Sequence, residues 1–263
     1  MILLADIGNT RTHLGWANRR RLLRTREVPT RDITAGNLAR TLRSWLGSAE
    51  VEGACVCSVV PSAAGPVLEA IRQATGVTPV VLGTRHLPGL SVAYPKPRTI
   101  GPDRLAGAVA ARWHFGAPVV VVGCGTATTF DVVDPDGCFV GGVIATGLSL
   151  LAEALHEHTA LLPRIRLRPP RRVVGRSTRE SMLSGAVLGY QGLVSEILRR
   201  IRLELRRPRL TVVATGGNAR WIAEVPGIRE VRPNLVLEGL RLTWEWQRGG
   251  TRNDEAGTTN IER

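Results

Sequence analysis

A single carboxylate, Asp6, ends a short apolar run near the start of the chain, and the small residues Gly8, Asn9 and Thr10 follow it closely. Glycine lets the backbone turn sharply and come close to a ligand. The N–H groups and hydroxyls of such a loop can donate to phosphate oxygens, and a carboxylate beside them can hold Mg²⁺ directly or through water. The stretch therefore predicts a site for nucleotide phosphates. The structural alternative is a tight connection in which Asp6 binds loop amides.

A second stretch nearly repeats the first one much later in the chain. Val120 to Thr129 aligns with Leu3 to Thr12 without gaps, and Gly123 stands where the first copy has Asp6. Two such loops, facing each other across a cleft, would clamp the phosphates of a nucleotide. The glycine turn "ATGG", at residues 214–217, is a further candidate element of that cleft. Neither a Walker pattern nor G-x-G-x-x-G is present, which excludes P-loop and Rossmann sites.

The composition is that of a globular protein. Apolar residues make up 43% of the 263 residues, enough for one large domain or two small ones. No apolar run approaches the roughly eighteen residues of a membrane span, and no basic segment precedes the apolar start, so we expect no signal peptide and a cytoplasmic location. The four cysteines form no C-x-x-C pair, which favours small buried hydrophobes over a metal site or disulfides.

The formal net charge is +13, and arginine carries nearly all of the positive charge. Clusters of arginine lie within residues 19–21, 164–172 and 199–209. A basic excess can indicate nucleic acid, a membrane surface or an anionic substrate. No recognised nucleic-acid motif surrounds these clusters. A solvated basic surface is the favoured interpretation, without a membrane or nucleic-acid partner.

Hydrophobic periodicity places the candidate residues on alternating strands and helices. Each half of the chain reads as strand, small-residue loop, strand, turn and strand, followed by helices, which predicts a duplicated α/β unit with a boundary near Gly116. Trp113 is expected in the core, and Thr84 to Thr99, with three prolines, is expected to be a loop. The expected strands in the first half are 2–6, 11–17, 22–28, 54–60 and 77–82, and the expected helices of the chain are 35–46, one after Pro61, one from Gly101, 148–158, 178–205 and 235–246.

Five short motifs occur in an order that resembles the type III pantothenate kinase family. They are "DIGNT", "SVVP", "GPDR", "GTATTFD" and "ATGG", and the resemblance covers about Ile2 to Trp246. It implies an α/β fold of two duplicated ribonuclease H-like domains of the actin-like ATPase and sugar-kinase superfamily, with the ATP cleft between the halves. The predicted halves are residues 1–116 and 117–248, followed by a flexible tail, 249–263. The implied activity is the ATP-dependent phosphorylation of pantothenate, the first step of coenzyme A biosynthesis, by a cytoplasmic homodimer.

The resemblance also implies roles for single residues. Asp103 matches the general base, which would orient the acceptor hydroxyl and take its proton. Without the resemblance, the favoured interpretation is that Asp103 complements the dipole of a helix in its first turn. Asp6 would hold Mg²⁺, either directly or through a bound water molecule. The implied ATP-binding residues are Asp6, Ile7, Gly8, Asn9, Thr10, Arg11, Thr12, His13 and Thr126, and the implied substrate-binding residues are Tyr94, Gly101, Pro102, Asp103, Arg104 and Thr178.

The chain departs from the family pattern at three positions. Pro102 stands where a small residue is commoner, and Thr146 replaces a usual proline. Gly123 replaces the carboxylate that holds a monovalent cation, K⁺ or NH₄⁺, in the family. We therefore expect this chain to use ATP and Mg²⁺ but to depend little on the monovalent cation. Two alternatives stay open at this stage: a kinase of another small molecule, and a non-catalytic regulatory or nucleic-acid-binding relative of the same fold.

Overall fold

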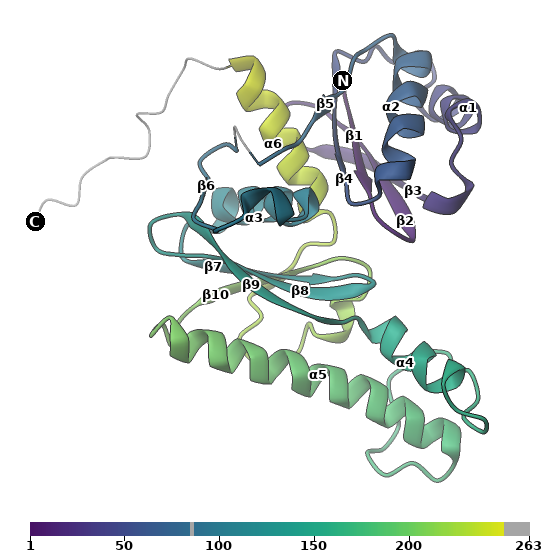
Figure 1. Cartoon of the computed structure of the whole chain (residues 1–263), viewed down its shortest axis with the longest axis vertical. Coiled ribbons are helices and arrows are strands. Elements are labelled where there is room, and N and C mark those ends of the chain that lie inside the picture. Colours follow the sequence, from purple (N-terminus) through teal and green to yellow (C-terminus); the bar gives the residue numbers. More distant parts are fainter. Residues whose placement is uncertain (85–86, 250–263) are drawn as a thin grey trace, which may run out of the picture.

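The computed structural model describes residues 1–84 and 87–249, and two β-sheets with helices between and outside them form its framework (Figure 1). The first sheet has the order β3-β2-β1-β4-β5, in which β1, β2 and β3 are antiparallel and β4 and β5 run parallel to β1. Its strands are β1 (Ile2–Ile7), β2 (Arg11–Ala17), β3 (Leu22–Pro29), β4 (Gly53–Ser58) and β5 (Val80–Val81).

The second sheet repeats this topology. Its order is β11-β10-β7-β8-β9-β6, with β7, β8 and β9 antiparallel and β10 and β11 parallel to β7. The additional strand β6 pairs with β9, although it precedes the second half in the chain. The strands are β6 (Ser91–Val92), β7 (Val119–Cys124), β8 (Ala127–Val133), β9 (Cys138–Thr146), β10 (Thr211–Thr215) and β11 (Glu230–Val231).

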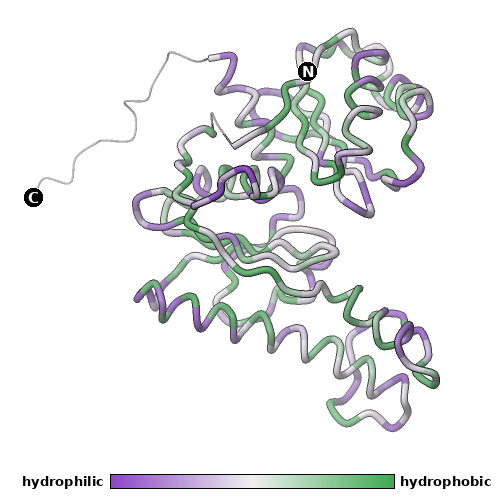
Figure 2. Tube along the Cα trace, in the orientation of Figure 1, coloured by the Kyte–Doolittle hydropathy of each residue, from purple (hydrophilic) through white to green (hydrophobic). Residues whose placement is uncertain are grey.

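Helices cover both outer faces and fill the space between the sheets. The helices α1 (Ala35–Leu46) and α2 (Pro61–Thr75) pack on the first sheet, while α4 (Leu148–Glu157) and α5 (Thr178–Glu204) lie on the outer side of the second. Figure 2 shows hydrophilic and hydrophobic residues alternating along α5, as expected for a helix with one face on a sheet. Between the sheets lie α3 (Pro102–Phe115) and α6 (Leu235–Gly249), packed in one apolar core with side chains of β1 and β7.

The duplication predicted from the sequence is present, with one correction. Asp6 is the fifth residue of β1, and Gly123 is the fifth residue of β7, so the two positions correspond. Asp6 pairs with His13 across its hairpin, whereas Gly123 pairs with Thr129. The second connection is thus one residue shorter than the first. The gap-free alignment was wrong beyond the loop.

Several expected elements differ from the observed ones. The strand expected at 77–82 is reduced to Val80–Val81, because Pro79 has no N–H for the ladder. The loop expected at Thr84 to Thr99 contains β6 and a short 3₁₀ helix, Pro97–Thr99. Further 3₁₀ turns lie at Thr30–Asp32 and Ala219–Trp221.

The C-terminal end of each central helix also departs from expectation. Trp113 was predicted in the core, but 68% of it is exposed, because the last turn of α3 projects beyond the part that the sheets cover. The final helix runs to Gly249, beyond the predicted Trp246, and the rest of the predicted tail lies outside the described residues. The division near Gly116 stays a prediction. No helix in the described part of the chain is long and apolar enough to cross a membrane.

Candidate active site

Asp6 occupies a half-buried position at the C-terminal end of β1. Its neighbour on the parallel strand β4 is Cys57, whose thiol donates to Asp6 Oδ1 across 3.3 Å. Burial, together with the negative charge of Asp103, raises the pKa of the Asp6 carboxyl to about 7, while the thiol contact acts in the opposite direction. The effect of the Asp103 charge on the Asp6 carboxyl places the two residues near each other, although they are 97 positions apart in the sequence. Two carboxylates in this arrangement favour the binding of a cation or of a proton.

Asp103 lies in the first turn of α3, as its second residue, two positions after the N-cap residue Gly101. Its Oδ1 atom is buried and has no hydrogen-bond partner among the described residues. A Cβ atom at Gly101 would lie 2.5 Å from this oxygen, so a side chain there would displace the carboxylate. Burial raises the pKa of Asp103, and the N–H and charge of Arg104 only partly oppose this effect. An unpartnered buried oxygen is what a ligand hydroxyl would satisfy.

The two predicted phosphate loops meet in the structure. The hydroxyls of Thr10 and Thr126 lie 3.2 Å apart, within hydrogen-bonding distance, although they come from different sheets. Each loop is closed by a glycine: the N–H of Gly8 donates to the carbonyl of Arg11, and that of Gly125 donates to the carbonyl of Ala127. The exposed hydroxyls therefore meet where the β1–β2 loop approaches the β7–β8 loop. This arrangement suits a chain of phosphate groups.

Thr30, which the sequence analysis did not single out, holds the first loop in place. Thr30 donates to the carbonyl of Gly8 across 2.7 Å, and its hydroxyl lies 3.0 Å from that of Thr12. Thr12 is fully buried, so the observed role of its hydroxyl is to hold the loop. His13 and Arg11 both face Glu27, at 3.3 and 3.4 Å. Direct contact of these three predicted residues with ATP stays a prediction.

The second loop is fixed by neighbouring glycine turns. The N–H of Gly147 donates to the carbonyl of Thr126, and the N–H of Asn218 donates to the carbonyl of Cys124. At Gly216, φ is +91°, and a Cβ atom would lie 2.7 Å from the Cys124 carbonyl oxygen. This close approach requires glycine. The "ATGG" turn thus lies beside the second loop, as the sequence predicted.

A second group of predicted residues gathers around Phe139 on β9. The Arg104 guanidinium lies 5.6 Å from the centre of the Phe139 ring, and the Tyr94 ring meets the same ring edge-on at 6.4 Å. The Nε atom of Arg104 donates to Asp131 Oδ1 across 2.5 Å. The second carboxylate oxygen of Asp131 accepts from the hydroxyl of Thr129 at 3.0 Å.

Asp131 is the most deeply buried acidic group in this arrangement. Only 2% of the residue is exposed, and burial raises its pKa to about 6, against the opposing effect of the Arg104 charge. Because the contact uses Nε, the terminal nitrogens of Arg104 remain available to a bound anion. Arg104 and Tyr94 therefore lie against the same aromatic ring, and their roles as substrate contacts stay a prediction.

Thr178 is the one predicted substrate residue that the chain does not bring to this group. It is exposed as the first residue of α5, after the N-cap Ser177. In the described part of the chain, no hydrogen bond or ion pair joins it to Tyr94, Arg104 or Asp103. Figure 1 shows α3 and α5 on opposite faces of the second sheet. Its role as a substrate contact stays a prediction.

The acidic residues fit a metal that is shared with phosphates rather than enclosed by protein. The described residues contain no cluster of three or more acidic, histidine or cysteine side chains that could hold an ion alone. Mg²⁺ commonly keeps several waters and uses one or two carboxylates together with substrate phosphates. Asp6, near the junction of the two loops, is the residue that would hold such an ion. Cys55, Cys57 and Cys124 are buried, as predicted for small hydrophobic residues, whereas Cys138 is half-buried.

The duplicated sheets and the paired phosphate loops define a kinase-like protein of the actin-like ATPase and sugar-kinase fold class. The family model of type III pantothenate kinase matches residues 2–200, and the chain belongs to this family. The chain is 45% identical to the type III pantothenate kinase of Akkermansia muciniphila, with 91% of this chain and 96% of the relative covered. It is 40% identical to that of Thermomicrobium roseum, with 93% and 97% covered.

Solved structures with this fold are more distant in sequence. A conserved protein of Campylobacter jejuni, assigned to the Baf family of transcriptional activators, aligns with a TM-score of 0.59 at 15% identity, over 94% of this chain and 99% of that one. The ethanolamine utilization protein EutJ of Carboxydothermus hydrogenoformans aligns with a TM-score of 0.53 at 15% identity, over 92% and 89%. At these identities the likeness extends to the fold alone.

Proposed function

We propose that this chain transfers the terminal phosphate of ATP to the primary hydroxyl of pantothenate, with Asp103 as the general base. The observation that carries the proposal is the juxtaposition of Asp103, with its unpartnered buried oxygen, and Asp6, at the end of the first phosphate loop. One carboxylate faces the acceptor and the other faces the phosphates. Membership of the family, at 45% identity to one relative, supports pantothenate as the acceptor.

In this mechanism the chain positions two reactants and neutralises charge. The loops that carry Thr10 and Thr126 hold the phosphates, and Arg104 binds the carboxylate of pantothenate. Asp103 orients the acceptor hydroxyl and takes its proton as the new bond to phosphorus forms. Mg²⁺, when bound with ATP near Asp6, would neutralise phosphate charge. A raised pKa makes the Asp103 carboxylate a stronger base than an exposed aspartate.

A panel of acceptors tests the proposed substrate. Pantothenate, N-acetylmannosamine and glucose would each be offered at the same concentration with ATP and Mg²⁺, and ADP release would be followed. We expect turnover with pantothenate to exceed turnover with either sugar by at least about 100-fold, ~2.7 kcal/mol of transition-state energy. Preference for a sugar would support the other-kinase alternative. Salt-dependent DNA binding without turnover would support the regulatory alternative.

Asp131 gives a prediction about acceptor binding, since it holds Arg104 in place. Asp131→Asn keeps the size of the side chain but removes the buried charge from the pair with Arg104. We expect the KM for pantothenate to rise at least about tenfold, ~1.4 kcal/mol, with the KM for ATP changed by less than about twofold. Asp136→Asn, on the exposed turn after β8, is the matched control. Equal increases in both KM values would show that Asp131 does not act through the acceptor site.

Gly123 gives a prediction about monovalent cations. A Cβ atom there would lie 2.7 Å from the Thr129 hydroxyl oxygen, and the nearby Asp131 carboxylate is already paired with Arg104. The position therefore has no free carboxylate with which to hold K⁺. Replacing Na⁺ by K⁺ at constant ionic strength is expected to change turnover by less than about threefold, ~0.7 kcal/mol.

Two variants extend this test. Gly123→Asp restores a carboxylate and should introduce activation by K⁺, after rotation of the Thr129 side chain. Gly123→Asn is the matched control, because it has the same size without the charge. If the parent protein is nearly inactive in Na⁺ and strongly activated by K⁺, another group supplies the cation site and this account of Gly123 is wrong.

The homodimer also belongs to the proposal. Exposed apolar side chains lie within the segment between α4 and α5: Leu161, Val173 and Val174 are 90%, 73% and 79% exposed. Apolar groups that are exposed together are typical of interaction surfaces. We expect a mass of two chains by light scattering, and Val173→Asp with Val174→Asp should shift it to one chain. A parent protein that stays monomeric at micromolar concentration would contradict the dimer.

A further inference from the structure

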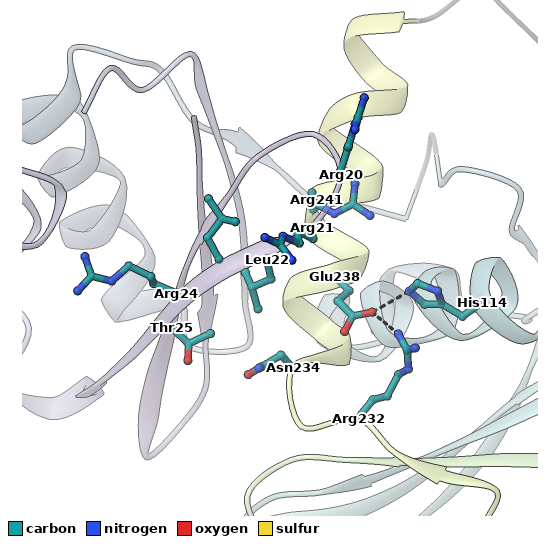
Figure 3. Close-up of a pocket in the computed structure, with 11 residues that line it drawn as sticks. Arg20, Arg21, Leu22, Arg24, Thr25, His114, Arg232, Asn234, Glu238 and Arg241 are labelled. Carbon is teal, nitrogen blue, oxygen red and sulfur yellow. Dashed lines mark hydrogen bonds and ion pairs between the residues drawn. The ribbon is translucent and has the colours of Figure 1, made fainter. Parts of the chain in front are cut away.

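A cavity of about 380 Å³ lies away from the two aspartates, at the other end of the central helix layer. One side is formed by the hairpin between β2 and β3, and the other by α6 and the end of α3, as Figure 3 shows. His114, which lines it, is eleven residues along α3 from Asp103, or roughly 16 Å along the axis. The hairpin is likewise separated from the Thr10 loop by the length of β2, roughly 20 Å. The cavity is therefore distinct from the candidate active site.

The lining of this cavity is strongly cationic. Five arginines and a single glutamate, Glu238, contribute to it. Glu238 is already occupied, since it accepts from Arg232 at 2.9 Å and contacts His114 Nε2 at 2.7 Å (Figure 3). The side chains of Arg20 and Arg21 have no carboxylate partner among the described residues, whereas Arg24 extends away from the cavity, with its guanidinium 5.8 Å from the centre of the Trp16 ring (Figure 3). Positive charge in the cavity is therefore left without compensation from the chain itself.

The backbone of the turn that carries Arg20 and Arg21 is held in place. Asn18 Oδ1 accepts from the N–H groups of both Arg20 and Arg21 at 2.8 Å, which fixes the hairpin turn. Arg241 on α6 donates to the carbonyl of Arg19 across 2.6 Å and ties the turn to the helix.

Arg241 itself supplies a second, independent observation. It is only 6% exposed, it lines the cavity, and its buried Nε atom has no hydrogen-bond partner. An unpartnered N–H on a buried guanidinium is costly and is normally satisfied by an acceptor. Glu245, which accepts from Arg241 Nη1, leaves this donor free. The cavity thus combines uncompensated charge with an unsatisfied buried donor.

We propose that this cavity binds a small phosphorylated anion with at least two negative charges. Arginine forks match phosphate oxygens, and the uncompensated charges of Arg20 and Arg21, together with the free Nε–H of Arg241, favour a multiply charged ligand over a single carboxylate. A concave volume of about 380 Å³ suits a small molecule. A nucleic-acid strand would need an open groove and aromatic side chains for stacking, and the lining contains neither Phe, Tyr nor Trp. The site goes beyond the proposed kinase function and does not depend on it.

Calorimetric titration with inorganic pyrophosphate, without Mg²⁺ and at physiological ionic strength, tests this site. The informative variant is Arg20→Gln with Arg21→Gln, which removes two uncompensated charges from the lining. The matched control is Arg206→Gln with Arg207→Gln, an exposed arginine pair outside the cavity with the same change in net charge. Thermal melting of both variants establishes that each is folded.

We expect the parent to bind pyrophosphate with submillimolar affinity, the cavity variant to bind at least about tenfold more weakly, and the control to stay within about twofold. Pyrophosphate bound at the phosphate loops would persist in all three proteins, so only the difference between the variants reports on the cavity. Equal affinities in the cavity variant and the parent would overturn the proposal. Equal losses in both variants would also overturn it, because they would indicate a general charge effect.

Discussion

Replacing Asp103 by Asn is expected to lower kcat by about 10²- to 10⁴-fold, the usual contribution of a general base, and to leave the affinity for ATP nearly intact. Asn keeps the shape of the side chain but cannot accept the proton. The raised pKa of Asp103 also predicts that the acid limb of kcat/KM lies above the ordinary range for aspartate, since the base must be ionised to act. Steady-state kinetics across pH, with ATP binding measured separately, checks both expectations.

The same variant separates catalysis from a role as a helix cap. Burial raises the pKa of Asp103, so the ionised form is less stable in the folded protein than in the unfolded one. Stability from this group is therefore present at low pH and is lost as the pH rises through the folded-state pKa. At neutral pH, Asp103→Asn should keep or raise the melting temperature while activity falls. A lower melting temperature with a parallel loss of ATP binding would support the helix-dipole interpretation instead.

Replacing Asp6 by Asn is expected to reduce Mg²⁺-dependent turnover by about two orders of magnitude or more. The substituted side chain still fits beside the thiol of Cys57, but the negative charge is gone. Titration of activity against Mg²⁺ at fixed ATP should shift to higher concentrations. An active variant with an unchanged Mg²⁺ titration would contradict the assignment. Asp32→Asn, a substitution of an exposed aspartate near the first loop, is the matched control.

The pKa of Asp6 adds a direction with pH to this prediction. With a value of about 7 in the absence of metal, the carboxyl is increasingly protonated as the pH falls below neutrality. A proton and Mg²⁺ then compete for the same oxygen atoms. The apparent Mg²⁺ affinity of the parent should fall by up to about tenfold per pH unit below 7, and the Asp6→Asn variant should lose this dependence. A parent affinity that is flat between neutral and mildly acidic pH would contradict it.

The sequence was most informative where local chemistry repeats. The glycines and threonines at Gly8, Thr10, Gly125 and Thr126 predicted two equivalent loops, and the structure brings their hydroxyls within 3.2 Å of each other. The long amphipathic helix 178–205 was confirmed as Thr178–Glu204. Both features are encoded by nearby residues, since turn chemistry and helical periodicity act over short stretches of chain.

The supporting residues of the site could not be predicted in the same way. Thr30 contacts Gly8, and Asp131 on β8 contacts Arg104 on α3, only because of how the sheets and helices pack. A buried aspartate at the end of "GTATTFD" could have prompted a search for a cationic partner. Only the tertiary structure shows which of the 35 basic residues is the partner of Asp131. The exposure of Trp113 is a similar case, because it depends on where the sheets stop covering α3.

The most direct test of the account is the identity of the product made from pantothenate and ATP. Purified protein with Mg²⁺ would be incubated with both substrates, and the product analysed by mass spectrometry and ³¹P NMR, with Asp103→Asn run in parallel. The account predicts phosphopantothenate carrying phosphate on the primary hydroxyl, formed by the parent and nearly absent with the variant. Hydrolysis of ATP without phosphopantothenate, or equal product from the folded Asp103→Asn protein, would contradict it.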